Sequence, residues 1–155
     1  MRRVRVHVSF FNHFDTIAGH PLTLKIIEKN PGDQQAIPFY YYNILLSGSD
    51  QPIGKISLRV GHNFHSYYNG NIGYEIDLAH RGHHYAAAAC QMLFPLAKAH
   101  GMEYLDITCD EDNIASYKTL ERLGAELLEI CTPPQSYCYW NETIQPHRIY
   151  RLKLQ

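Results

Sequence analysis

The sequence predicts an α/β fold built around a strand–turn–helix–strand–helix unit in residues 70–125. Two observations support this prediction. Within the unit, an Ala-rich helix separates two short apolar strands, which is the pattern of parallel strands joined by a helical crossover. On both sides of the unit, short segments alternate apolar and polar residues, as half-buried strands do. We therefore expect the flanking strands to complete the sheet of the central unit.

The part of the chain ahead of this unit is expected to be rich in strands. The sequence predicts strands at residues 4–10, 22–28, 39–46 and 53–60. The basis is the alternation of apolar with polar residues in these segments and the turn residues that lie between them. Residues 1–20 could form a loosely attached peripheral arm, with an irregular stretch at 11–20. The polar, aromatic segment 61–71 is expected to be a loop long enough to line a pocket.

The central unit begins with a strand at Ile72–Ile76 and continues with a helix from about His84 to His100, closed by Gly101. Pro95 lies inside this helix and should kink it, because proline lacks the N–H that bonds to the preceding turn. Asp112 or Asn113 is expected to cap the second helix. The remaining expected elements are strand 102–109, helix 114–123 ended by Gly124, strand 126–131, loop 132–143 and strand 148–154.

Length and composition favour one ordinary globular domain over residues 1–155. Hydrophobic residues make up 45% of the chain and charged residues 19%. The formal net charge of −1 leaves no basic excess, so nucleic-acid binding is not expected. The four cysteines form no CxxC pair and are expected to be buried, reduced thiols. Because no signal peptide or membrane span is evident, we expect a cytoplasmic protein that does not bind membranes.

The turn after the first strand of the unit is a candidate phosphate-binding site. A helix start presents free backbone N–H groups and a partial positive charge, both of which favour an anion. Arg81 adds a full positive charge, and glycine at position 82 permits backbone conformations that other residues resist. The amides offered to a pyrophosphate would be those of Gly82, His83, His84, Tyr85 and Ala86.

Two motifs in this unit give the chain a resemblance to the GNAT-type (GCN5-related) N-acetyltransferases. The turn reads Arg81-Gly82-His83-His84-Tyr85-Ala86 and is similar to the family's Arg/Gln-x-x-Gly-x-Gly/Ala pyrophosphate loop. The run Asn113-Ile114-Ala115-Ser116 is similar to the family's Asn-x-x-Ser/Ala helix start. His84 stands where the family has its central glycine. A side chain there is tolerable if its backbone keeps a helical conformation.

The resemblance implies the GNAT fold, with a mixed and mostly antiparallel twisted sheet of about six or seven strands. It also implies acetyl-CoA as co-substrate and no metal. Two strands of the unit would splay apart, and the pantetheine arm would enter the gap and hydrogen-bond like an extra strand. The cofactor-binding residues implied in this way are Ile76, Asp77, Leu78, Arg81, Gly82, His83, His84, Tyr85, Ala86, Asn113 and Ser116.

The implied reaction is acyl transfer to an amine, for which a base must accept a proton. Glu75 is the first candidate, because it precedes the strand end where the thioester would lie; alternatively it points to solvent or pairs with Arg59. Asp77, His62 and His65 are further candidate bases. The tyrosine that many family members carry as general acid is replaced by Leu120. Ser116, acting through water, or Tyr117 could take its place.

The resulting functional prediction is an N-acetyltransferase that transfers an acetyl group from acetyl-CoA to a primary amine of a small molecule or peptide by direct attack in a ternary complex. The alternative is a catalytically weak or inactive acyl-CoA-binding module. A zinc site built from His62, His65, His80, His83 and His84 is a third, weaker possibility. The acceptor would meet loop 61–71, the Tyr40–Tyr42 strand and the loop around Trp140. The protein would be a monomer or homodimer.

Overall fold

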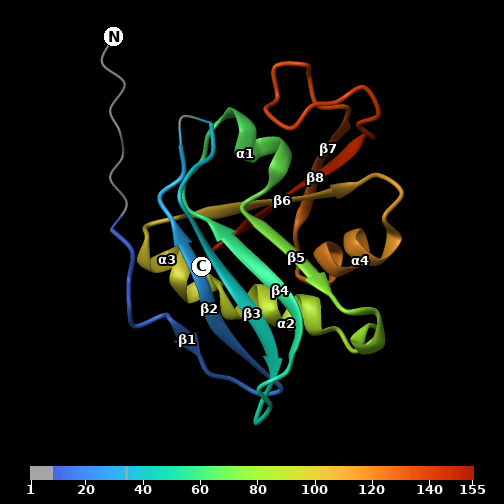
Figure 1. The fold of residues 1–155 in the computed structure, drawn as a ribbon. Coiled ribbons are helices and arrows are strands. Elements are labelled where there is room, and N and C mark those ends of the chain that lie inside the picture. Colours follow the sequence, from blue (N-terminus) through green and yellow to red (C-terminus); the bar gives the residue numbers. More distant parts are fainter. Residues whose placement is uncertain (1–8, 34) are drawn as a thin grey trace.

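The computed structural model describes residues 9–33 and 35–155, so most of the strand expected at 4–10 lies outside the described residues. The described chain forms two antiparallel sheets (Figure 1). The first has five strands in the order β1-β2-β3-β4-β5, and the second has three in the order β6-β8-β7. The strands are β1 (Thr16–Ile17), β2 (Leu22–Asn30), β3 (Phe39–Leu46), β4 (Pro52–Arg59), β5 (Ile72–Ile76), β6 (Tyr104–Asp110), β7 (Glu126–Cys131) and β8 (His147–Lys153).

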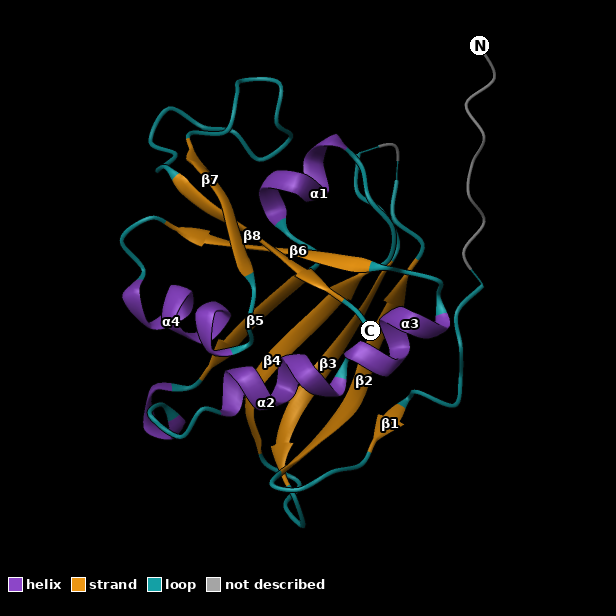
Figure 2. Cartoon of the chain, turned by 180° about the vertical axis from the view of Figure 1, so that it is seen from behind, coloured by secondary structure: helices purple, strands orange, loops and turns teal. Residues whose placement is uncertain are grey.

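The helices lie on different sides of these sheets. Helices α2 (Tyr85–Met92) and α3 (Phe94–Ala99) cover one face of the five-stranded sheet, as Figure 2 shows. Helix α4 (Ile114–Arg122) contacts α2 and β6, whereas α1 (Phe64–Asn69) contacts β6 and β8. A short 3₁₀ turn, η1 (Leu78–His80), links β5 to the turn before α2. The strand–turn–helix–strand–helix unit predicted for residues 70–125 is therefore confirmed.

Three local predictions need correction. Segment 61–71 is not a loop throughout, because Asn63 caps α1 in a capping box, accepting from the Ser66 N–H at 2.7 Å while the Ser66 hydroxyl accepts from the Asn63 N–H at 2.9 Å. The helix expected over 84–100 is two helices that divide at Leu93, with Pro95 in the first turn of the second. The stretch 11–20 contains the short strand β1.

The N-terminal arm is fastened to the sheet in the residues that the structure describes. The backbone N–H of Phe11 donates to the Tyr40 hydroxyl at 2.8 Å, and the Tyr42 hydroxyl donates to the carbonyl of Phe14 at 2.7 Å. Lys29 forms an ion pair with Asp15. Residues 10–17 also pack on the hydrophobic core. The arm is therefore not loosely attached over this range.

Strands β5 and β6 do not form the parallel ladder that the sequence pattern suggested. They belong to different sheets and meet near Asn71, just before β5 begins. The Asn71 side chain is fully buried; its oxygen accepts from the Asp106 N–H at 2.8 Å, and its amide donates to the carbonyls of Arg59 and Gly61 at 3.1 and 2.8 Å. The Asn71 N–H also donates to the Asp106 carbonyl. Asn71 thus joins the two sheets at this end and leaves the carboxyl end of β5 free of β6.

Candidate active site

The backbone of β5 has one edge on β4 and one edge toward the gap between the sheets. The N–H of Asp77 donates to the carbonyl of Ile53 at 2.8 Å, so this group faces β4. Because backbone groups alternate along a strand, those of Tyr74 and Ile76 face the gap. The Asp77 N–H is therefore already used within the sheet. At Ile76 the gap-facing carbonyl accepts from Arg81 Nε at 2.9 Å, which leaves the Ile76 N–H as the group offered to the gap.

Close contact between β4 and β5 keeps this edge in place. A Cβ at position 54 would overlap the backbone carbonyl of Glu75, so only glycine fits there. The Arg81 side chain is also used structurally, because its bond to Ile76 folds the turn back onto the end of β5. Its other guanidinium nitrogens make no hydrogen bond within the described residues, and the residue is exposed. They can still approach a phosphate.

The Arg81–Ala86 turn has a backbone conformation that the sequence did not predict. His84 has φ 61° and ψ 24°, in the left-handed region, and so lacks the helical conformation in which a side chain would be tolerated without strain. Gly82 is also left-handed, with φ 88°. Such a conformation costs a non-glycine residue about 1–2 kcal/mol. Among the described residues, His84 is the sole non-glycine residue with positive φ, so position 84 keeps a glycine-like backbone although it is not glycine.

The turn leads directly into α2, whose first N–H groups are available to an anion. His84 is the N-cap residue but makes no side-chain cap, and the first turn contains no acidic residue. The exposed side chains of His83 and His84 stand beside these amides. The predicted residues Gly82, His83, His84, Tyr85 and Ala86 therefore form one continuous turn and helix start, as a phosphate cradle requires.

The Asn113–Ser116 motif contacts β5 through Tyr74, a residue that was not among the predicted site residues. Asn113 caps α4, accepting from the Ser116 N–H at 3.2 Å. The Ser116 hydroxyl lies 2.8 Å from the hydroxyl of Tyr74 on β5. Burial raises the pKa of Tyr74 to about 12, so its hydroxyl is protonated at neutral pH. Alternation along β5 was the one signal for this residue, because it places Tyr74 on the helix side of the sheet.

The two other α4 positions that bear on the general acid, Leu120 and Tyr117, lie in different surroundings from Ser116. Leu120 is fully buried in the hydrophobic core. The Tyr117 ring packs under the guanidinium of Arg148 on β8, at 4.2 Å from its centroid. Of the two predicted acids, Ser116 is thus the one in contact with β5.

Glu75 lies on the other face of β5 from Tyr74. Its side chain is exposed, and its neighbour across the ladder is Lys55. The alternative pairing with Arg59 is not found, because Arg59 instead donates to the carbonyl of Gly70 at 3.1 Å. The two further histidine candidates are engaged elsewhere: His62 stacks on Tyr104, and His65 Nδ1 accepts from the Cys138 N–H at 3.0 Å. Glu75 and Asp77 are therefore the two exposed carboxylates at the free end of β5, and neither forms an ion pair among the described residues.

The described residues also bear on the expected acceptor site, the cysteines, metal ligands and membrane-spanning helices. Tyr40 and Tyr42 are fully buried, so they do not line an acceptor site. Cys90 and Cys109 are buried thiols, whereas Cys131 and Cys138 are half-buried. No group of three metal-ligating side chains gathers within residues 9–33 and 35–155. No helix in the same ranges is long and apolar enough to cross a membrane.

Comparison with known families agrees with this geometry. Residues 12–126 match the family described as "Acetyltransferase (GNAT) domain". The chain belongs to the GNAT acetyltransferase family. It is accordingly an acyltransferase domain with acetyl-CoA as co-substrate. The matched range includes both motifs, β5 and the gap. No curated protein gave a significant match.

Solved structures show the same fold at low sequence identity. A GNAT-family protein from Chromobacterium violaceum is 16% identical, with a TM-score of 0.63, covering 89% of this chain and 85% of that one. A ribosomal-protein-alanine acetyltransferase from Vibrio fischeri is 19% identical, with a TM-score of 0.60, covering 76% and 62%. The microcin self-immunity acetyltransferase MccE, solved with acetyl-CoA and AMP, is 20% identical, with a TM-score of 0.58, covering 74% and 61%. The chain thus spans less than two thirds of two of these proteins.

Proposed function

We propose that this GNAT acetyltransferase transfers an acetyl group from acetyl-CoA to a primary amine of a small molecule or peptide, by direct attack within a ternary complex. The observation that carries the proposal is the placement of two proton-handling groups on opposite faces of β5. Glu75 is exposed on one face, and the Tyr74–Ser116 pair lies on the other, against α4. An acetyl group held at the gap between the sheets would have a base on one side and a proton donor on the other.

The cofactor would be held by backbone groups and one cation. The pyrophosphate would sit on the amides of residues 82–86, with Arg81 adding charge. Pantetheine would pair with the free N–H of Ile76 and with the backbone at Asp77 and Leu78, and the α4 start at Asn113 and Ser116 would contact its far side. An N–H on this stretch of β5 would polarise the thioester carbonyl. These assignments rest on the exposed turn and the free strand edge.

The chemical step would then proceed without a covalent enzyme intermediate. Glu75 accepts a proton from the ammonium form of the acceptor, directly or through water. The neutral amine forms the C–N bond to the thioester carbon. The tetrahedral intermediate gives its second N–H proton to Glu75, which has passed the first proton to solvent, and the C–S bond breaks. The CoA thiolate leaves and is protonated by the Tyr74 hydroxyl, which is resupplied through Ser116. With its pKa near 12, Tyr74 keeps its proton at neutral pH until the thiolate forms.

Release of free thiol from acetyl-CoA across a panel of primary amines tests the proposal. We expect amine-dependent release that Glu75→Gln reduces by about 10²–10⁴-fold at neutral pH, the usual contribution of a general base. Tyr74→Phe should lower kcat while leaving the CoA dissociation constant unchanged. The matched control is Tyr41→Phe, on β3 and outside the gap.

The same assay separates this function from a binding module without turnover, which the strained His84 and the buried Leu120 favour. Thermal stabilisation by CoA with no thiol release from any amine would reject the enzyme and keep the binding module. Absence of any stabilisation by CoA would count against both.

A further inference from the structure

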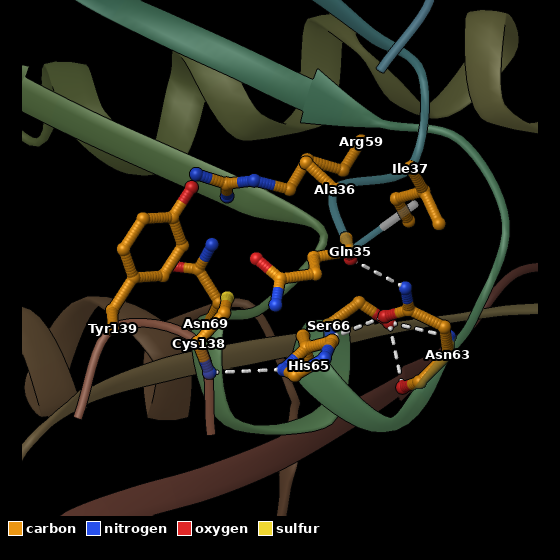
Figure 3. Close-up of a pocket in the computed structure, with 10 residues that line it drawn as sticks. All are labelled: Gln35, Ala36, Ile37, Arg59, Asn63, His65, Ser66, Asn69, Cys138 and Tyr139. Carbon is orange, nitrogen blue, oxygen red and sulfur yellow. Dashed lines mark hydrogen bonds between the residues drawn. The ribbon is translucent and has the colours of Figure 1, made fainter. Parts of the chain in front are cut away.

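A hollow lies beyond the end of β5 opposite the Arg81–Ala86 turn (Figure 3). Three segments that are far apart in sequence form its wall: the β2–β3 connection at 35–37, α1 with its cap, and the loop after β7 at 138–139. It is a small depression: its empty space of about 220 Å³ includes open solvent, and only about 10 Å³ of it can hold the centre of a water molecule. Arg59, the last residue of β4, reaches into it from the sheet.

Arg59 is a partly buried cation without a partner anion. Its Nη1 donates to the carbonyl of Gly70 at 3.1 Å, and that is its one side-chain hydrogen bond among the described residues. No ion pair within residues 9–33 and 35–155 includes it. Burial lowers the pKa of the Arg59 guanidinium below its usual value, because the charge is desolvated without a compensating carboxylate. An anion in the hollow would offset this cost.

The hollow has a second hydrogen-bond donor. His65 Nδ1 accepts from the Cys138 N–H, so in the neutral ring the proton is on Nε2. The carboxylate of Asp33, on the same connection, is exposed and accepts from the backbone N–H groups of Gln35 and Ala36, both at 2.7 Å, and it forms no ion pair with Arg59. The hollow therefore presents one cation, the Arg59 guanidinium, and one further hydrogen-bond donor, His65 Nε2.

The hollow lies on the same face of the sheet as Glu75. Arg59 and Lys55 occupy alternate positions of β4, and Lys55 is the ladder neighbour of Glu75. Between them lies Gly73, where an added Cβ would lie 3.7 Å from Arg59 Nη1 and 3.3 Å from the Ser57 hydroxyl. Glycine at position 73 keeps the path from Arg59 to Glu75 clear. Glu75 lies two positions along the strand from Gly73, a distance of about 7 Å.

We propose that this hollow binds an anionic group of the acceptor, so that the substrates are primary amines carrying a carboxylate several bonds from the reactive nitrogen. This inference rests on the proposed function, because it uses Glu75 as the place where the amine is deprotonated. From Gly73, which lies beside Arg59 Nη1, to Glu75 is about 7 Å along β5. This span suits an ω-amino acid, or a peptide with an acidic side chain near its N-terminus. A simple α-amino acid is too short to reach both Arg59 and Glu75.

The test compares carboxylates with their neutral amides. We expect kcat/KM to be at least about tenfold higher for 6-aminohexanoate than for 6-aminohexanamide, the effect of one charge-assisted hydrogen-bonded pair. Arg59→Gln should bring this ratio to about one, with the far-UV circular dichroism spectrum and the CoA affinity unchanged. The matched control is Lys55→Gln, which removes an exposed cation from the same face of the same strand and should keep the preference.

A second pair of acceptors distinguishes the two sources of the carboxylate. The tripeptide amides with sequences Ala-Glu-Ala and Ala-Gln-Ala differ in one side-chain charge. Preference for the Glu peptide alone identifies an acidic peptide as the acceptor, and preference for 6-aminohexanoate alone identifies a small amino acid. Equal kcat/KM within both pairs, or loss of the preference in Lys55→Gln and not in Arg59→Gln, would overturn the proposal while leaving the acetyltransferase function in place.

If no amine is acetylated, the proposed function fails, and the hollow is judged by binding. Titration calorimetry of the same four compounds into the CoA-bound protein should show binding of the carboxylate members, with loss in Arg59→Gln. Equal binding of carboxylate and amide, or none of either, would reject the anion site.

Discussion

At the scale of single residues, Asn71 has the largest structural role among the polar side chains described. Asn71→Ala would leave the Asp106 N–H and two carbonyls without partners inside the protein. We expect it to lower the free energy of unfolding by about 2–4 kcal/mol, which urea unfolding would measure. Asn43→Ala, on the half-buried face of β3, is the control and should cost under about 1 kcal/mol. Similar losses for both variants would show that Asn71 does not join the sheets.

His84 gives a second prediction at this scale, because its conformation and not its side chain is what the turn requires. His84→Gly should bind CoA at least as tightly as the unaltered protein, since glycine adopts φ 61° without strain. His84→Val should weaken CoA binding about tenfold or more, because a β-branched residue resists positive φ. Fluorescence or calorimetric titration with CoA measures both. Equal affinities for the Gly and Val variants would contradict this account of the turn.

Sequence reasoning at the residue scale succeeded where one local rule decided the outcome and failed where distant contacts did. The cap of α4 was predicted to be Asp112 or Asn113, and it is Asn113; this was predictable because capping depends on the next three residues. Asn71 and Tyr74 were missed, because their partners Asp106 and Ser116 lie 35 and 42 positions away. The left-handed conformation of His84 was not predicted, because the motif position alone does not fix the backbone and the fold of the turn decides it.

At the scale of elements, α4 shows why a family motif does not transfer residue by residue. Leu120 occupies the position where many relatives have tyrosine, yet its side chain is fully buried in the core. Leu120→Tyr should therefore not create a general acid. We expect it to destabilise the protein by about 1–3 kcal/mol through overpacking, with no gain in thiol release. Thermal unfolding and the amine-dependent assay measure the two effects. A gain in kcat without loss of stability would show that position 120 reaches the gap.

Element boundaries were predicted well where the pattern was regular, as in β3, β5 and β7, whose observed bounds match the expected ones. The short helix α1 was missed because its sequence is polar and aromatic without helical periodicity, and its capping box was the one available signal. Pro95 was correctly singled out, but the helix divides at Leu93 and does not merely bend. The division of strands between two sheets was also not predictable, because it depends on the contacts of Asn71 and on the pairing of β8 between β6 and β7.

At the scale of the whole molecule, the two sheets are joined at one end of β5 and open at the other, and this asymmetry predicts where CoA acts. Asn71 already joins β5 to β6 at the start of the strand. CoA that pairs with the carboxyl end of β5 and with the α2 and α4 starts would supply the second connection between the sheets. A ligand that binds the folded state raises stability by about 2.7 kcal/mol at a hundredfold excess over its dissociation constant.

Hydrogen–deuterium exchange should show this connection directly. We expect CoA to slow exchange at residues 76–78 and 82–87 and at the start of α4, with little change around Asn71, whose N–H is already bonded to Asp106. Arg81→Ala should reduce this protection, because the side chain both adds charge and ties the turn to Ile76. Arg122→Ala, in the last turn of α4, is the matched control and should leave the protection intact. Protection spread evenly over both sheets, or confined to the Arg59 hollow, would contradict CoA binding in the open gap.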